Sequence, residues 1–187
     1  WLFSFVSLKD GRMLTFGNNS WGQLGDGKIV QTQTPVKILG IQVKAAAANT
    51  NSSFLVDKEG SLWSFGKGDW GDLGSGLSLS SLPTQVEQKG VIAVSSKNST
   101  VLFQDENGSL FGFGHGDYGK LGHNSKKNHH TPTMLFGHKV LSFASGEHHG
   151  AKVIEDGSLW TFGKNNFGEL GDGTNSERLS PIKIVDQ

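Results

Sequence analysis

The chain has 187 residues, with 17 basic and 17 acidic side chains and therefore no formal net charge. A neutral chain creates no overall field that attracts nucleic acid or an anionic membrane surface. The sequence contains no cysteine, which excludes disulfide bonds and any metal site or nucleophile that needs a thiol. No apolar run approaches the roughly 20 residues of a membrane-spanning helix. For this stretch we therefore expect neither membrane insertion nor nucleic-acid binding.

Glycine supplies 27 residues, while 35% of the chain is hydrophobic. The glycine content is about twice the average of globular proteins. Glycine-rich sequence with this many apolar residues predicts frequent turns around a packed core rather than disorder.

An internal repeat organises the whole chain. Four segments align without gaps, at residues 10–27, 59–76, 107–124 and 156–173. The glycines at their second positions are Gly11, Gly60, Gly108 and Gly157, and a proline follows each segment in register at Pro35, Pro83, Pro132 and Pro181. The period is therefore about 49 residues, which is typical of repeat architectures. We predict a single domain over 1–187, whole or partial, with repeats at approximately 1–35, 36–83, 84–132 and 133–181.

The repeat decides how one glycine motif is interpreted. Gly66-x-Gly68-x-x-Gly71 has the spacing of a phosphate-binding loop and recurs in the third copy. In the other two copies the middle glycine is an asparagine, the non-glycine residue that best tolerates a positive φ. No helix pattern follows the motif, as a dinucleotide site would require. We therefore predict a left-handed turn here and no nucleotide cofactor.

Each repeat contains signals for four short strands. The hairpin turns are Asp10-Gly11, Glu59-Gly60, Asn107-Gly108 and Asp156-Gly157; such pairs favour type I′ turns. Apolar or alternating segments flank each turn and predict a hairpin. Strands of small residues are expected upstream, at 41–48, 91–97 and 140–146, and a fourth strand is expected after each proline.

Four strands per repeat without helical periodicity predict an all-β fold, a β-propeller of four-stranded antiparallel blades. The chain covers about four blades, and we expect an arc of a larger, seven-bladed ring. The aromatic pairs of the strand after each turn lie two residues apart, so that both rings share one face. These pairs are Trp63/Phe65, Phe111/Phe113 and Trp160/Phe162, and we expect them to pack between blades. Trp21, Trp70, Tyr118 and Phe167 share another repeat position, and we expect the same packing role for them.

The repeat "SGEHHGAKVIEDGSLWTFGKNNFGELGDGTNSERLSPIKI" and its copies resemble the regulator of chromosome condensation family of propeller repeats. This resemblance implies a seven-bladed ring of four-stranded blades and favours an intracellular location. The resemblance also suggests a second function, guanine-nucleotide exchange on a small GTPase, which is the activity of the family's founding member. That activity is implied to need an inserted β-hairpin, for which the regular spacing between Gly11 and Gly157 leaves no room.

Carboxylates and histidines could suggest an enzyme or a metal site. Asp10, Glu59 and Asp156 all occupy the same hairpin position, which explains them as turn formers. Glu147-His148-His149 occurs in one copy only, and adjacent residues of a strand point to opposite faces. We therefore expect no catalytic residue, no metal and no cofactor, and we predict that the chain is not an enzyme.

The predicted function is a protein–protein interaction scaffold that binds a protein partner through its blade loops. Such loops vary on a rigid framework and commonly carry binding function. The candidate partner-binding residues are Lys126, Lys127, His129, His130, Glu147 and His148. The alternatives are guanine-nucleotide exchange on a small GTPase and inhibition of an enzyme by the propeller.

Overall fold

The computed structural model describes residues 3–137 and 139–184, which form fifteen strands and one short 3₁₀ helix. The strands make four antiparallel sheets, here named blades A to D. Blade A contains β1 (Phe3–Ser7), β2 (Met13–Gly17) and β3 (Thr32–Lys37). Blade B contains β4 (Val43–Ala48), β5 (Ser52–Asp57), β6 (Leu62–Lys67) and β7 (Leu79–Gln85). Blade C contains β8 (Val91–Lys97), β9 (Thr100–Asp105), β10 (Leu110–Gly114), the helix η1 (Asp117–Gly119) and β11 (His129–Phe136). Blade D contains β12 (Val140–Ser145), β13 (His149–Ile154), β14 (Leu159–Gly163) and β15 (Arg178–Ile184). The expected all-β fold is confirmed: blades B, C and D each contain four antiparallel strands, and blade A contains three among the described residues.

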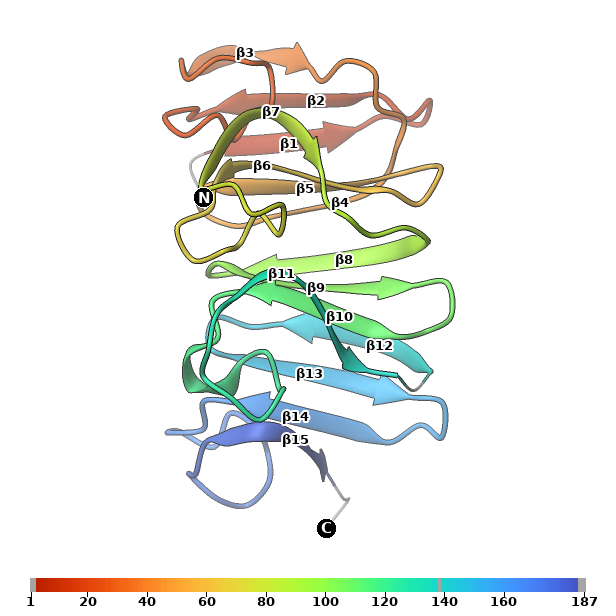
Figure 1. The fold of residues 1–187 in the computed structure, drawn as a ribbon, viewed down its shortest axis with the longest axis vertical. Coiled ribbons are helices and arrows are strands. Elements are labelled where there is room, and N and C mark those ends of the chain that lie inside the picture. Colours follow the sequence, from red (N-terminus) through yellow and green to blue (C-terminus); the bar gives the residue numbers. More distant parts are fainter. Residues whose placement is uncertain (1–2, 138, 185–187) are drawn as a thin grey trace.

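Each strand pairs with the next one along the chain, so every blade is a meander. In blade B the hairpin runs from the Ser52–Gly66 pair to the Val56–Leu62 pair. Gly60 has a φ of +79°, a conformation that favours glycine and places the turn where the sequence predicts it. The β5–β6, β9–β10 and β13–β14 turns lie together on the right in Figure 1. We call this edge of the molecule the hairpin end.

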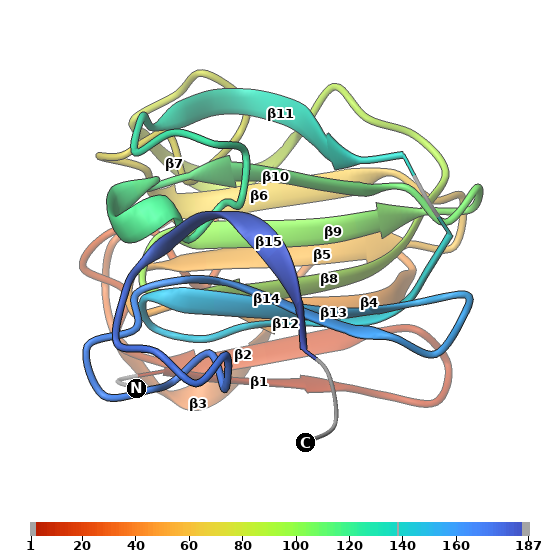
Figure 2. The ribbon, with the colours of Figure 1, turned by 90° about the horizontal axis from the view of Figure 1, so that it is seen from below.

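The blades succeed one another along the long axis of the molecule (Figure 1), and Figure 2 views the same stack from blade D. The small-residue strands β4, β8 and β12 lie innermost: β4 contacts β8, and β8 contacts β12. Alanine and serine are common in these strands, which allows neighbouring inner strands to approach closely.

The outer strands differ from the expected pattern. Each begins before the repeat proline: Pro83, for example, lies inside β7 (Leu79–Gln85), not ahead of it. The ladder between β6 and β7 shifts register between Ser64 and Gly66, and the irregularity accommodates a residue that has no backbone N–H. Because β7 is an edge strand, the missing donor breaks no ladder on its other side.

The hydrophobic core lies between the blades. One cluster joins Phe54 and Val56 of blade B to Phe103 and Phe113 of blade C. Equivalent clusters join blade A to B around Met13, Leu55 and Phe65, and blade C to D around Leu102, Leu121 and Phe162. Phe65, Phe113 and Phe162 belong to these clusters, and Trp63 and Phe111 pack against them, so the predicted packing between blades is confirmed for these five rings. Trp160 is half-buried and is not among the residues of the blade C–D cluster.

Candidate interaction surface at the loop end

The connections at the opposite edge from the hairpin turns form one surface, here called the loop end. It contains the short inner loops between β4 and β5, β8 and β9, and β12 and β13. It also contains the long outer loops between β6 and β7, β10 and β11, and β14 and β15. The helix η1 marks this edge on the left in Figure 1.

Four aromatic side chains reach solvent at the loop end. Trp21, Trp70, Tyr118 and Phe167, here called the aromatic strip, are exposed by 39%, 48%, 38% and 87%. The expectation that they pack in the core like the strand aromatics is therefore wrong. These residues lie in turns rather than in strands, and in the turns no second blade covers both faces of a ring.

Each of the first three rings contacts a basic side chain of the next blade. The Lys67 ammonium lies 4.2 Å from the centre of the Trp21 ring. The imidazole of His115 stacks on Trp70 at a centroid distance of 4.7 Å. The Lys164 ammonium lies 5.4 Å from the centre of the Tyr118 ring. The three basic residues occupy one repeat position, directly after Phe-Gly, so each junction between described blades has a ring contact from this position. The two lysine contacts are cation–π interactions, which contribute about 0.5–1 kcal/mol each at exposed sites.

The turn that carries each aromatic residue has its own side-chain cap. The backbone N–H of Trp21 donates to Gln23 at 2.9 Å, that of Trp70 donates to Asp72 at 3.2 Å, and that of Phe167 donates to Glu169 at 2.7 Å. The equivalent residue in blade C is Lys120. Its ammonium can only donate hydrogen bonds and therefore cannot accept one from the backbone N–H of Tyr118. In that blade the turn is the 3₁₀ helix η1, and Tyr118 has a φ of +60°.

Lys120 turns inward instead. It is 1% exposed, and its Nζ donates to the carbonyl oxygen of Asn98 at 3.0 Å and lies 3.1 Å from Nδ1 of His115. Asn98 and Ser99 have φ values of +43° and +59°, an uncommon conformation for such residues that clusters at functional sites. Burial lowers the pKa of Lys120 to about 8, although nearby carboxylates oppose the shift.

A second buried charge lies one blade away. Asp72 is 2% exposed and lines a small cavity of about 50 Å³ together with Asn51, Trp70 and Ser99. Burial raises the pKa of Asp72, against hydrogen bonds that include the one from Trp70. Lys120 and Asp72 place buried groups of opposite charge beneath the exposed rings, and both are specified by the one repeat position that varies most in chemistry.

The six predicted partner-binding residues all lie in or beside loop-end connections. Glu147 and His148 are in the β12–β13 loop, where the Glu147 carbonyl accepts a hydrogen bond from Asn98 and His148 meets the edge of the Tyr118 ring at 5.2 Å. The remaining four are in the β10–β11 loop or at the start of β11. Lys127 and His130 are exposed, Lys126 pairs with Glu177 of blade D at 2.5 Å, and His129 bonds Thr133 at 2.8 Å.

The asparagines of the glycine motif have a different role from the one predicted. The left-handed turn predicted at Asn18 and Asn165 is wrong, because neither residue has a positive φ. The residue of blade A that aligns with Gly68 and Asn165 is Asn19, and Asn19 and Asn165 are both fully buried. The Asn165 amide donates to the Thr174 and Ser176 carbonyls, and its oxygen accepts from the Leu170 N–H at 3.0 Å. Asparagine at this position therefore anchors the following loop.

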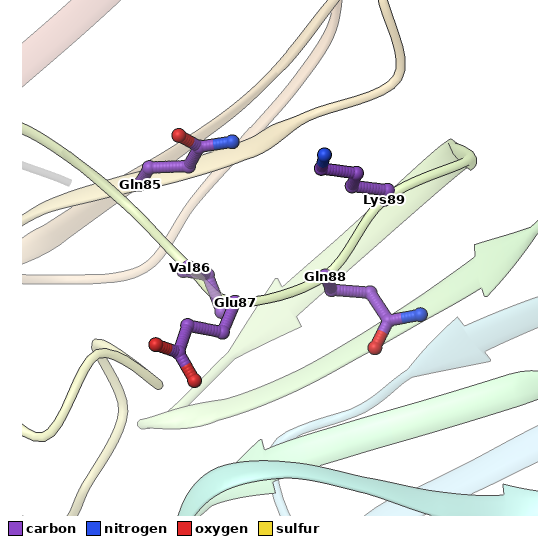
Figure 3. Close-up of a pocket in the computed structure, with 5 residues that line it drawn as sticks. All are labelled: Gln85, Val86, Glu87, Gln88 and Lys89. Carbon is purple, nitrogen blue, oxygen red and sulfur yellow. The ribbon is translucent and has the colours of Figure 1, made fainter.

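One cavity lies away from this surface, at the hairpin end. Residues 85–89, the link between β7 and β8, line a hollow of about 610 Å³, and Figure 3 shows their side chains. The charged side chains there, Glu87 and Lys89, are exposed, and the hollow has no arrangement typical of catalysis.

Among residues 3–137 and 139–184 no group of three or more histidines or carboxylates could hold a metal ion. No helix in that same part of the chain is long and apolar enough to cross a membrane.

Comparison with known proteins identifies the family. Human WBSCR16 superposes with a TM-score of 0.85 at 26% identity, over 97% of this chain and 49% of its own. Prp20p from Saccharomyces cerevisiae gives 0.86 at 21% identity, over 99% and 49%, and the structure of Kap60 bound to yeast RCC1 (Prp20) gives 0.81 at 21% identity, over 99% and 47%. The chain thus spans about half the length of these structures. No curated protein sequence matches it significantly. The regulator of chromosome condensation (RCC1) repeat model matches residues 10–56, 107–153 and 156–186, well over half of the chain, and the chain therefore belongs to the RCC1 repeat family.

Proposed function

We propose that this chain is a non-enzymatic scaffold whose loop end binds a protein partner. The aromatic strip is the observation that carries the proposal. Trp, Tyr and Arg dominate the binding energy of protein interfaces, since a rigid ring buries a large area at low entropic cost. Here three such rings and Phe167 are exposed on a framework of packed blades.

The surroundings of the strip support the same function. Trp21 is held by the Lys67 ammonium, and Trp70 is held by the His115 imidazole and its capped turn, so little conformational entropy is lost when a partner covers them. Charged side chains of both signs border the strip, such as Lys67 with Asp69 at 2.6 Å. This pattern of an aromatic centre with a polar rim is typical of protein interfaces.

The fold relatives are consistent with a protein partner. The structure of Prp20p was reported with its binding to Gsp1p and histones, and another structure contains Kap60 bound to yeast RCC1. Membership of the family keeps guanine-nucleotide exchange on a small GTPase as the alternative function. Faster release of labelled GDP from a GTPase in the presence of this chain would support that alternative.

Site-specific crosslinking tests the proposed scaffold function. A photoreactive phenylalanine analogue replaces Trp70 in one variant and Lys89, at the hairpin end, in the control. We expect the first variant to crosslink one protein from an extract of the native cells and the control to crosslink none of it. The double variant Trp70→Ala/Tyr118→Ala should reduce binding of that protein at least about tenfold, because each ring is expected to contribute 1 kcal/mol or more. Equal crosslinking at both positions would contradict the proposal.

A further inference from the structure

The contact between Lys120 and His115 permits only one arrangement of protons that satisfies every group. An ammonium can only donate hydrogen bonds, so Nδ1 of His115, 3.1 Å from the Lys120 Nζ, must accept. The ring proton then lies on Nε2, which is 3.0 Å from a carboxylate oxygen of Asp117. The charged lysine, the neutral imidazole and the carboxylate form a continuous chain, and the imidazole in its middle is the ring that stacks on Trp70.

Acid breaks this chain at a defined atom. A second proton on His115 must be placed on Nδ1, which puts two donors and two positive charges face to face. Lys120 cannot retreat into water, because it is 1% exposed and its amine is also bonded to the Asn98 carbonyl. His115 lies on the exposed side, as does Asp117, whose side chain is 56% exposed. The imidazolium ring therefore moves outward toward Asp117 and leaves the face of Trp70.

The other charged groups around the pair do not cancel this repulsion. Burial and then the Lys120 charge lower the pKa of His115, and Asp117 raises it. His148, on the β12–β13 loop, adds a further effect that lowers the pKa. Asp72 of blade B and Glu147 of blade D act on Lys120 and favour its charged form. Both carboxylates therefore keep the lysine protonated and the neutral imidazole as its partner.

We propose that His115 is an acid-sensitive latch that holds Trp70 at neutral pH and releases it when the imidazole is protonated. The consequence for partner binding rests on the proposed scaffold function. The latch itself is a property of the isolated chain and is tested without a partner.

The test is a pH titration by NMR of the isolated chain, with histidine ring carbons and tryptophan indole groups labelled. The Trp70 signal is assigned with Trp70→Phe. We expect the Trp70 indole signal to move with the same midpoint as His115, below the ordinary histidine value of 6.5. In Lys120→Gln, which introduces the residue that blade A has at position 23, both midpoints should rise together by about one pH unit, since a like charge at this distance is removed. His130→Gln is the matched control and should change neither midpoint.

Three results would overturn the latch. The first is a Trp70 signal that stays constant while His115 titrates. The second is an unchanged His115 midpoint in Lys120→Gln. The third, which does not depend on the stability of that variant, is a Trp70 signal with the same pH dependence in His115→Asn as in the natural chain.

Discussion

Replacement of Lys152 by methionine should stabilise the protein. Lys152 is 4% exposed on β13, and its ammonium lies 3.1 Å from the centre of the Phe136 ring of blade C and 5.7 Å from that of Trp160 in its own blade. The same position is Leu55 in blade B and Phe103 in blade C, both in apolar clusters. The lysine therefore places a charge where the other blades bury hydrocarbon.

The magnitude follows from the proton equilibrium. Burial lowers the pKa of Lys152 from 10.5 to about 8. The folded state binds this proton more weakly than the unfolded state does. The charged lysine therefore destabilises the protein by its full amount below pH 8, and this destabilisation disappears as the pH rises from 8 toward 10.5. At 1.36 kcal/mol per unit the full shift would exceed 3 kcal/mol; solvent screening reduces our expectation to about 1–2 kcal/mol.

Urea unfolding of the natural chain and Lys152→Met at two pH values measures this effect. At pH 6.5 the variant should gain about 1–2 kcal/mol in free energy of unfolding, and at pH 9.5 most of the gain should disappear. Lys183→Met is the control, because Lys183 is exposed on the same blade and its loss should change stability by less than about 0.5 kcal/mol. A variant that is destabilised at pH 6.5, or a gain that does not change with pH, would refute the argument.

Three further changes test other parts of the fold. Phe113→Ala should cost about 3–5 kcal/mol in urea unfolding, because its buried ring contacts Phe54 across the blade B–C interface. Asn165→Ala should speed amide hydrogen exchange in the β14–β15 loop, since the side chain bonds several of its backbone groups; unchanged exchange would exclude the anchoring role. Burial lowers the pKa of His123 and of His129, and each is lowered further by a neighbouring histidine. The unfolded chain therefore binds more protons below about pH 6.5, and the urea midpoint should fall between pH 7.5 and 5.5, less so in His123→Gln.

The blades and their core could be predicted from sequence because the signals are local and repeated. A glycine turn between two segments of alternating apolar and polar residues predicts a hairpin. Two aromatic residues spaced two apart in a strand are predicted to lie on the same face of that strand. The aromatic strip was visible in the alignment, but the sequence does not distinguish a ring in a turn from a ring in a strand. The outer strands begin earlier than the sequence predicts, because an edge strand with a register shift accommodates the repeat proline within the strand.

The buried charges could not be predicted, because they depend on contacts between loops that meet only in the folded blade. In the sequence Lys120 is one of four different residues before Leu-Gly, and this pattern does not show that its side chain is buried. Its partners are a carbonyl 22 residues away and a histidine five residues away, which the fold brings together at the loop end. Asp72 likewise meets Ser52 and Asn49 only after blade B has formed.

The position occupied by Gln23, Asp72, Lys120 and Glu169 shows how one framework accommodates different chemistry at each junction. Three of these side chains cap the same turn, which keeps the aromatic ring in place while the charge changes from neutral to negative. Lys120 cannot accept the hydrogen bond that caps the turn in the other blades, and the turn in blade C is the 3₁₀ helix η1. None of these four residues belongs to a core cluster, so a change at this position leaves the core side chains between the blades in place. Variation at this position therefore alters the surface beneath each exposed ring without altering the blade that carries it, which is the property that a recognition surface on a repeat framework requires.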